Sequence, residues 1–415
     1  MMLHSFIVFA ILCSGIYACG QHALVPSSSE EDVISQVLAR SPSSATSKTA
    51  IRNVRVFNGY HFTLPTTIIF DGEYITDDVD TIETTIDGTG QFLIPGLFDS
   101  HLHISDLSGL ENATSYGVTT VINMACRNYA ACWPLRNQAG LASFYSAGIP
   151  ATGVNSSHAN SMKLPPSMLT YPNTDITELV SQAFGNSSDF YKITAEIMGP
   201  SQQQQIEAVA VAHNMFHRQT MTHASDVNAY SQAVASQTDG IQHVPDDGPL
   251  SACTIASMKA RGQFSTPTMN IFKLGYSDPA IAAFTGRTNS TDRSYSNVVK
   301  NVQRLHRAGI PIVAGTDAVG SNAVPGVDIP FGRTLHDELY YLVNEGGLTT
   351  AEALRAATSE PAKRHRLEDR GTVQVGKRAD LILLNSNPLA NISNTLDIAR
   401  IWAGGIVVEK IATLA

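Results

Sequence analysis

Residues 96–103, Gly-Leu-Phe-Asp-Ser-His-Leu-His, contain two histidines separated by a single residue. The apolar residues around them are typical of a buried β-strand, in which alternate side chains point to the same face. His101 and His103 therefore project together from this strand. Two imidazoles on one face can share a metal ion, but such pairs also occur as ordinary partly buried residues, so the pair alone does not establish a metal site.

After Pro95, apolar strand-like segments alternate with longer amphipathic segments such as residues 201–216 and 226–236. Strands that alternate with helices form parallel sheets, and eight such units predict a closed (β/α)8 barrel, which we place at residues 95–368. The eight candidate strands are residues 96–103, 117–125, 147–155, 189–195, 219–225, 239–245, 262–270 and 311–319.

Short β-branched segments flank this region on both sides. Residues 51–59, 66–72 and 81–87 end in Gly or Asp and predict strands joined by tight turns. After a helical stretch at 349–364, residues 371–385 and 399–410 again predict strands, which we expect to return to the N-terminal sheet. The predicted fold class is α/β, a (β/α)8 TIM barrel with a small β-sandwich built from residues 50–94 and 369–415.

Four later strands carry a metal-binding or ionisable residue toward their C-terminal halves, namely Lys192, His223, His243 and Asp317. Active sites of such barrels form at the C-terminal ends of the strands. With His101 and His103, these residues would meet at one rim. The combined pattern predicts a metal site made of His101, His103, Lys192, His223, His243 and Asp317.

Lys192 is the unusual member of this set, because burial disfavours its charged form and lowers the pKa of a lysine. A neutral amine can react with carbon dioxide, and the resulting carbamate is an anionic oxygen donor able to bridge two divalent ions. The alternative is a structural lysine paired with an aspartate.

The segment IPGLFDSHLH, the later Lys192, His223 and His243, the Gly-Thr-Asp at 315–317 and the stretch GTVQVGKRADLILLNSNPL together resemble the amidohydrolase superfamily. The likeness extends from about residue 51 to 410 and is greatest to the imidazolonepropionase-like and prolidase-like branch, which includes a secreted fungal amidase that hydrolyses ochratoxin. The resemblance implies two metal ions, with His101, His103 and Asp317 at one, His223 and His243 at the other, and carboxylated Lys192 between them.

Imidazole and oxygen ligands favour zinc. A hydroxide shared by two such ions would be a strong nucleophile near neutral pH, and Asp317 would carry its proton to the leaving amine. We expect an amide bond of an N-acyl amino acid or a dipeptide-like compound to be cleaved. Hydrolysis of lactones, cyclic imides or imidazolone-like rings, metal-assisted decarboxylation or isomerisation, and a non-catalytic barrel are the alternatives.

Several further residues have a functional and a structural interpretation. His158, after the third strand, is either a substrate contact or a surface-loop residue. Tyr191 should point outward into the helix layer, and a structural role is favoured for His336 and Glu338. Arg127 could pair with a substrate carboxylate, and Asp246 and Asp247 could recognise a substrate amine. For all three, the favoured interpretation is a solvated charge in a loop.

The charge balance and the N-terminus bear on partners and location. A net charge of −9 without a Lys/Arg-rich stretch excludes a nucleic-acid partner and favours a small-molecule substrate. The apolar run from Phe6 to Ala18 predicts a signal peptide at residues 1–20, followed by a loose tail at 21–49. We expect a secreted protein without membrane attachment after cleavage; an uncleaved anchor, a lipidated Cys19 and a homo-oligomer stay open.

Two features agree with secretion. Five Asn-x-Ser/Thr sequences begin at Asn112, Asn155, Asn186, Asn289 and Asn391, a number that chance also allows. Cys126 and Cys132 are close enough in sequence for a small disulfide loop. The spacing of the cysteines is not that of a Cys-x-x-Cys zinc site.

Overall fold

The computed structural model of the protein describes residues 47–287 and 292–409. The predicted signal peptide and all but the last residues of the predicted tail lie outside them. In these two ranges no helix is both long and apolar enough to cross a membrane.

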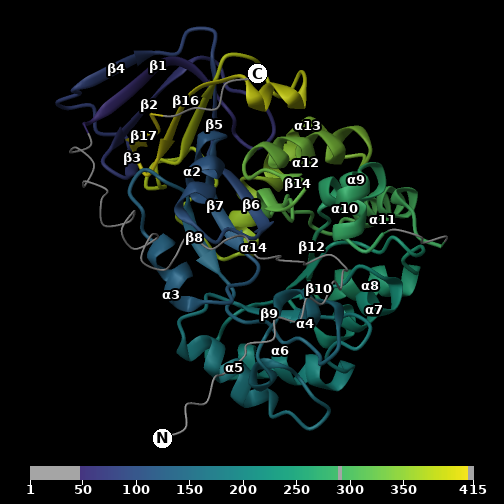
Figure 1. Ribbon diagram of the computed structural model, residues 1–415. Coiled ribbons are helices and arrows are strands. Elements are labelled where there is room, and N and C mark those ends of the chain that lie inside the picture. The colour runs from purple at the N-terminus through teal and green to yellow at the C-terminus, as the bar shows by residue number, and fades with distance from the viewer. Residues whose placement is uncertain (1–46, 288–291, 410–415) are drawn as a thin grey trace, which may run out of the picture.

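The small β domain combines both ends of the described chain, which lie together at the top of Figure 1. Its strands follow the order β17-β16-β15-β5-β1-β2-β3, and β4 also pairs with β1. β15 runs antiparallel to β5, with Leu383 opposite Leu93, so the expected return of the C-terminal segment is confirmed. Phe70 of β2 packs edge-on against Trp402 of β16, with ring centroids 5.7 Å apart. The strands are β1 (Thr49–Val56), β2 (Thr66–Asp71), β3 (Tyr74–Thr76), β4 (Thr84–Asp87), β5 (Phe92–Pro95), β15 (Leu381–Leu384), β16 (Ile398–Ala403) and β17 (Ile406–Val407).

Seven parallel strands and one irregular segment close the barrel. β6, β7 and β8 form one parallel sheet, and β9 to β12 form another. The bridge Ala147–Phe190 joins the two sheets, while Ser265–Ile312 and Leu102–Ala318 close the ring through the eighth segment. The strands are β6 (Leu97–Leu102), β7 (Val118–Asn123), β8 (Ser143–Ser146), β9 (Tyr191–Thr194), β10 (Thr220–His223), β11 (Gly240–Gln242) and β12 (Phe264–Thr266).

Two of the eight predicted strands are wholly or largely irregular in the structure, and the seventh, predicted at 262–270, ends at Thr266 before α9 begins at Met269. The third regular strand, β8, ends at Ser146, just before the predicted range of 147–155, which contributes only isolated bridges. Pro150 lacks the N–H that a continuous ladder requires. The eighth segment, 311–319, is also held by bridges alone, because Asp317 has a positive φ of 58° that breaks the extended conformation.

Helices cover the outside of the barrel. The two predicted between strands are confirmed: α6 begins after Ser201, which forms a capping box with Gln204, and α7 begins after Asp226. The predicted helical stretch 349–364 is two helices, because Pro361 cannot donate the bond that would join them. The helices are α2 (Leu107–Ser115), α3 (Tyr129–Cys132), α4 (Ser157–Met162), α5 (Ile176–Gly185), α6 (Gln202–Phe216), α7 (Val227–Ser236), α8 (Ala252–Ala260), α9 (Met269–Ser277), α10 (Pro279–Phe284), α11 (Tyr295–Arg307), α12 (Arg333–Asn344), α13 (Thr350–Ala356) and α14 (Ser359–Arg364). A hairpin, β13 (Gly320–Val324) and β14 (Val327–Ile329), precedes α12.

Candidate metal centre

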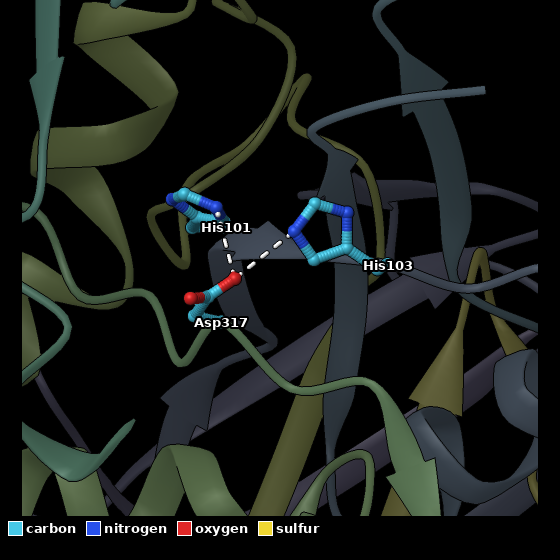
Figure 2. A group of neighbouring side chains, drawn as sticks. All are labelled: His101, His103 and Asp317. Carbon is cyan, nitrogen blue, oxygen red and sulfur yellow. Dashed lines mark hydrogen bonds and ion pairs between the residues drawn. The ribbon is translucent and has the colours of Figure 1, made fainter. Parts of the chain in front are cut away.

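His101 and His103 converge on Asp317 (Figure 2). His101 is on β6, and His103 follows the last residue of that strand. The Nε2 atoms of His101 and His103 lie 3.2 and 3.0 Å from the same atom, Oδ1 of Asp317. A ligand atom from each of the three residues lies within 4.8 Å of the others, a spacing that suits one shared cation. Strand alternation therefore brings both imidazoles to one side of the barrel, as predicted.

The backbone places Asp317 opposite the two histidines. Its N–H donates to the carbonyl oxygen of His101 at 2.7 Å, and the N–H of Thr316 donates to the same oxygen at 3.0 Å. The positive φ of Asp317 turns the chain at this point, a conformation that non-glycine residues seldom adopt. His243 has a similar φ of 71°. Two of the predicted ligands thus sit at backbone positions of the kind that cluster at functional sites.

His223 and His243 extend the group of imidazoles. His223 ends β10, and His243 follows β11. Their ring centroids are 4.5 Å apart, and the ring of His243 lies 4.8 Å from that of His101. Four histidines from three strands therefore form one continuous cluster, which we call the metal centre together with Lys192 and Asp317.

Lys192 lies inside the barrel, with 4% of the residue exposed. Its neighbour on β9, Tyr191, packs outward with apolar residues such as Ala208 and Ala212 of α6, as predicted. Alternation along the strand then directs Lys192 inward. Its charge is one of the influences, after burial, that lower the pKa of His101 and His243, which places Lys192 in the same cluster.

Protonation states in the cluster suit metal ligation. Burial lowers the pKa of His101 to about 3 and depresses the pKa values of His103, His223 and His243. Burial opposes ionisation of Asp317, but the neighbouring imidazoles of His101, His103 and His243 hold its pKa well below the usual value. The set therefore consists of neutral imidazoles and an ionised carboxylate, all with lone pairs to donate.

Hydrogen bonds outside the cluster orient two imidazoles. Nδ1 of His101 donates to Oε1 of Gln242 at 2.9 Å, and Nδ1 of His243 lies 2.7 Å from Oγ1 of Thr268. A neutral His101 that donates from Nδ1 turns an unprotonated Nε2 toward Asp317. Two electron-pair donors thus face each other at 3.2 Å, an arrangement that a cation between them stabilises. The residues fit a divalent metal ion.

Asp99 and Thr316 connect β6, which carries His101, to the segment that carries Asp317. Asp99 on β6 is fully buried and accepts from Oγ1 and N of Thr316, at 2.7 and 3.1 Å, and from N of His101, at 3.1 Å. Burial raises the pKa of Asp99 to about 7, although these bonds act in the opposite direction. The pair ties the turn before Asp317 to the strand of His101.

His158 is buried in α4 beside the predicted ligand His223, so it does not belong to a surface loop. It is 7% exposed, and its ring centroid lies 4.5 Å from that of His223. Nδ1 of His158 lies 2.9 Å from Oε1 of Glu196, which also accepts from the backbone N–H of His158 at 3.1 Å. Sequence reasoning missed Glu196, although it follows β9 at the end of the barrel where the site was expected.

The structural interpretation of His336 and Glu338 agrees with their surroundings on α12, but both are buried and do not solvate that helix. His336 bonds through Nδ1 to Thr395 and through Nε2 to the carbonyl of Tyr116, at 2.8 and 2.9 Å. Glu338 accepts from the N–H of Asn270 at 2.7 Å, and burial raises its pKa to about 8.

The loop charges behave in different ways. Arg127 is exposed, whereas Asp246 is fully buried, with both oxygens in bonds to arginines. Both interpretations of Asp246 are therefore wrong: it is not a solvated loop charge, and its oxygens are not free to recognise a substrate amine. Asp247 is exposed and accepts a hydrogen bond at 2.9 Å from the N–H of Val227, the first residue of α7. It is therefore an ordinary loop residue, as the favoured interpretation has it. Cys126 and Cys132 form a disulfide after β7.

Solved structures with the same architecture support this description. A Xaa-Pro dipeptidase with methionine bound in its active site superimposes with a TM-score of 0.76 and 20% identity, covering 87% of this chain and 99% of that one. Molinate hydrolase gives 0.70 and 19%, covering 89% and 96%. The ochratoxinase of A. niger gives 0.69 and 17%, covering 88% and 96%. At these identities the likeness establishes the fold: a TIM barrel with a small β domain.

Sequence comparison adds a family. Adenine deaminase 2 of Shouchella clausii (strain KSM-K16) is 37% identical over 87 residues, which are 18% of this chain and only 15% of that protein. The amidohydrolase family matches residues 92–408, a range that includes every residue of the metal centre. The chain therefore belongs to the amidohydrolase family, whose members typically bind divalent metal ions.

Proposed function

We propose that the protein is a metal-dependent amidohydrolase that cleaves the amide bond of an N-acyl amino acid or a dipeptide-like substrate. The observation that carries the proposal is the convergence of Nε2 of His101 and Nε2 of His103 on Oδ1 of Asp317, at 3.2 and 3.0 Å. His223, His243 and the buried Lys192 belong to the same cluster. Similar folds named as a dipeptidase, molinate hydrolase and ochratoxinase support hydrolysis as the reaction.

The proposed ligands fall into two groups. His101, His103 and Asp317 would hold one divalent ion, and His223 and His243 would hold the other. Zinc is the metal that we propose for both. Lys192 would lie between them as a carbamate, formed when the uncharged form of its amine adds to carbon dioxide and loses a proton. When bound, two such ions would supply an activated water near neutral pH and would polarise the carbonyl of the amide.

The remaining steps belong to side chains. Asp317 is ionised and buried, so it can accept a proton from the attacking water and deliver it to the nitrogen of the leaving amine. His158 lies at the His223 side of the centre, where Glu196 orients its ring for contact with the substrate carbonyl. The products are a carboxylic acid and an amine.

Chelation tests the proposal directly. Protein stripped of metal should lose hydrolysis of N-acyl amino acids and recover it when zinc is restored. Full activity in a preparation shown to be metal-free by elemental analysis would refute the proposal. A parallel assay on lactones and cyclic imides tests the main alternative. A much higher rate on those rings would show that the protein is a metal-dependent hydrolase of cyclic compounds and not of N-acyl amino acids.

We also propose that the protein is secreted and glycosylated. The Asn residues of four Asn-x-Ser/Thr sequences are exposed, and the Cys126–Cys132 disulfide suits an oxidising compartment. Asn289 lies outside the described residues. Expression in a secreting eukaryotic cell, followed by N-terminal sequencing and glycosidase digestion of the protein in the medium, tests this. Retention of residues 1–20 on cell-associated protein would contradict it.

A further inference from the structure

A cavity of about 220 Å³ lies beside the metal centre, on the side of His223. Its wall is formed where β9 and β10 end, by residues that follow α10, and by Arg293, which precedes α11. Residues from these elements share the space: Glu196, Ile197, His223, Asp226, Arg287 and Arg293. A predicted metal ligand and two arginines therefore line one cavity.

Asp246 positions both arginines by accepting hydrogen bonds from them. Its Oδ2 accepts from Nε of Arg287 at 3.0 Å and from the hydroxyl of Tyr276 at 2.9 Å, while its Oδ1 accepts from Nη1 of Arg293 at 2.6 Å. Asp246 is fully buried, so this carboxylate must be paired in the folded protein. It is shared by two guanidinium groups, and Arg293 therefore has less than a full counter-charge.

Arg293 keeps donors for a ligand. Within the described chain its hydrogen bonds run through Nη1, to Asp246 and to the carbonyl of Ser225, and its side chain is 30% exposed. Nε and Nη2 are thus available on a side chain that lines the cavity. A guanidinium group binds a carboxylate through two parallel hydrogen bonds, a geometry that a lysine does not provide.

The other carboxylates of the wall are already engaged. Asp226 accepts from the N–H of Ala229 at the start of α7, at 2.8 Å. Glu196 accepts from His158 at 2.9 Å. Neither would compete strongly for Arg293, and no separate salt bridge joins either of them to it in the described chain.

Arg287 is also fixed relative to the metal centre. The guanidinium of Arg287 lies 4.3 Å from the ring centroid of Phe272, and that ring lies 6.0 Å from the ring of His243. Ile197, at the same cavity, is 80% exposed and offers an apolar surface. A ligand here meets a cationic group, an apolar group and the metal centre.

We propose that Arg293, positioned by Asp246, binds the free carboxylate of the substrate, so that the amine released is an amino acid at the C-terminal end of the compound. This rests on the proposed function. Ile197 then favours an apolar side chain on that amino acid. A substrate whose carboxyl group is blocked as an amide loses the paired hydrogen bonds and the charge.

The test compares N-acetyl-L-methionine with N-acetyl-L-methioninamide on the metal-loaded protein, by calorimetric binding and by hydrolysis. The wild type should bind the acid about 10- to 100-fold more tightly than the amide. Arg293→Gln should remove this preference by weakening the acid alone, and Arg293→Lys should restore part of it. Lys300→Ala, at an exposed position of α11 away from the cavity wall, should leave the preference unchanged.

The outcomes separate the two proposals. Equal binding of acid and amide by the wild type, or no detectable binding of the acid at about 10 mM, overturns the carboxylate subsite. An equal loss for acid and amide in Arg293→Gln also overturns it, because Arg293 then has a structural role. Failure of the proposed function shows itself differently, as bound acid that is never hydrolysed.

Discussion

Nε2 of His101 lies 3.2 Å from Oδ1 of Asp317, and the bond from Nδ1 of His101 to Gln242 leaves no proton on the nitrogen between them. Two lone pairs that face each other at this distance repel unless a cation intervenes. These side chains are therefore arranged so that they could hold a cation at this point. The same relationship explains why metal content should affect stability as well as activity.

Metal removal should lower the melting temperature. At zinc concentrations 100-fold above the dissociation constant, binding to the native state alone contributes about 2.7 kcal/mol. Differential scanning calorimetry of stripped and zinc-loaded protein measures the change. His101→Ala should lose most of the zinc-dependent increase, whereas the exposed His217→Ala should keep it. Equal melting temperatures with and without bound zinc would contradict the prediction.

Lys192→Ala should lower the rate of amide hydrolysis on the order of 1000-fold, because several kcal/mol of transition-state stabilisation depend on correctly held metal ions. Lys300→Ala, at an exposed position of α11, is the matched control. Short carboxylic acids such as propionate should restore part of the rate of Lys192→Ala by taking the place of the carbamate. An unchanged rate in Lys192→Ala would exclude a bridging role for this lysine.

Thr316→Val should weaken zinc binding or turnover about 10- to 100-fold, although Thr316 is not a metal ligand. The substitution removes the 2.7 Å bond from Oγ1 to buried Asp99 and loosens the turn that positions Asp317. It should also cost about 1–3 kcal/mol of stability. Thr316→Ser keeps the hydroxyl and should behave like the wild type. If both variants are equally impaired, the methyl packing and not the hydrogen bond is the cause.

His336 should make stability depend on pH. Burial lowers the pKa of His336 from 6.5 to about 4, so between these values the unfolded chain binds a proton that the folded protein does not. Stability is complete above pH 6.5 and falls as the pH decreases to 4, by up to about 3 kcal/mol from this residue. Urea unfolding at several pH values should give a shallower slope for His336→Gln. The exposed His217→Gln should keep the wild-type slope, and a slope unaltered in His336→Gln would refute the assignment.

Local pattern was enough to predict the frame of the site. Alternation along β6 places His101 and His103 on one face, and the same alternation turns Tyr191 out and Lys192 in. The common rim of a parallel barrel then brings His223, His243 and Asp317 to these residues. Each of these inferences depends only on the period of a strand and the direction of its neighbours, which the sequence contains.

Local pattern was misleading where backbone geometry interrupts the period. The third strand ends before Pro150, and the eighth is reduced to bridges around Asp317. In the second case the interruption is itself part of the site, because the left-handed turn directs the carboxylate at two histidines.

The sequence by itself determined the fold class and six residues that could meet at a barrel rim. Only the tertiary structure decided which partners orient them and which charges are available to a substrate. Hydrogen bonds join His101 to Gln242, His243 to Thr268 and His158 to Glu196, and each partner lies on another strand or loop. Asp246, which the sequence allowed as an amine-binding residue, is paired with Arg287 and Arg293, 41 and 47 positions away. Periodicity is a property of adjacent residues, whereas desolvation and pairing of charge depend on groups that only the folded chain brings together.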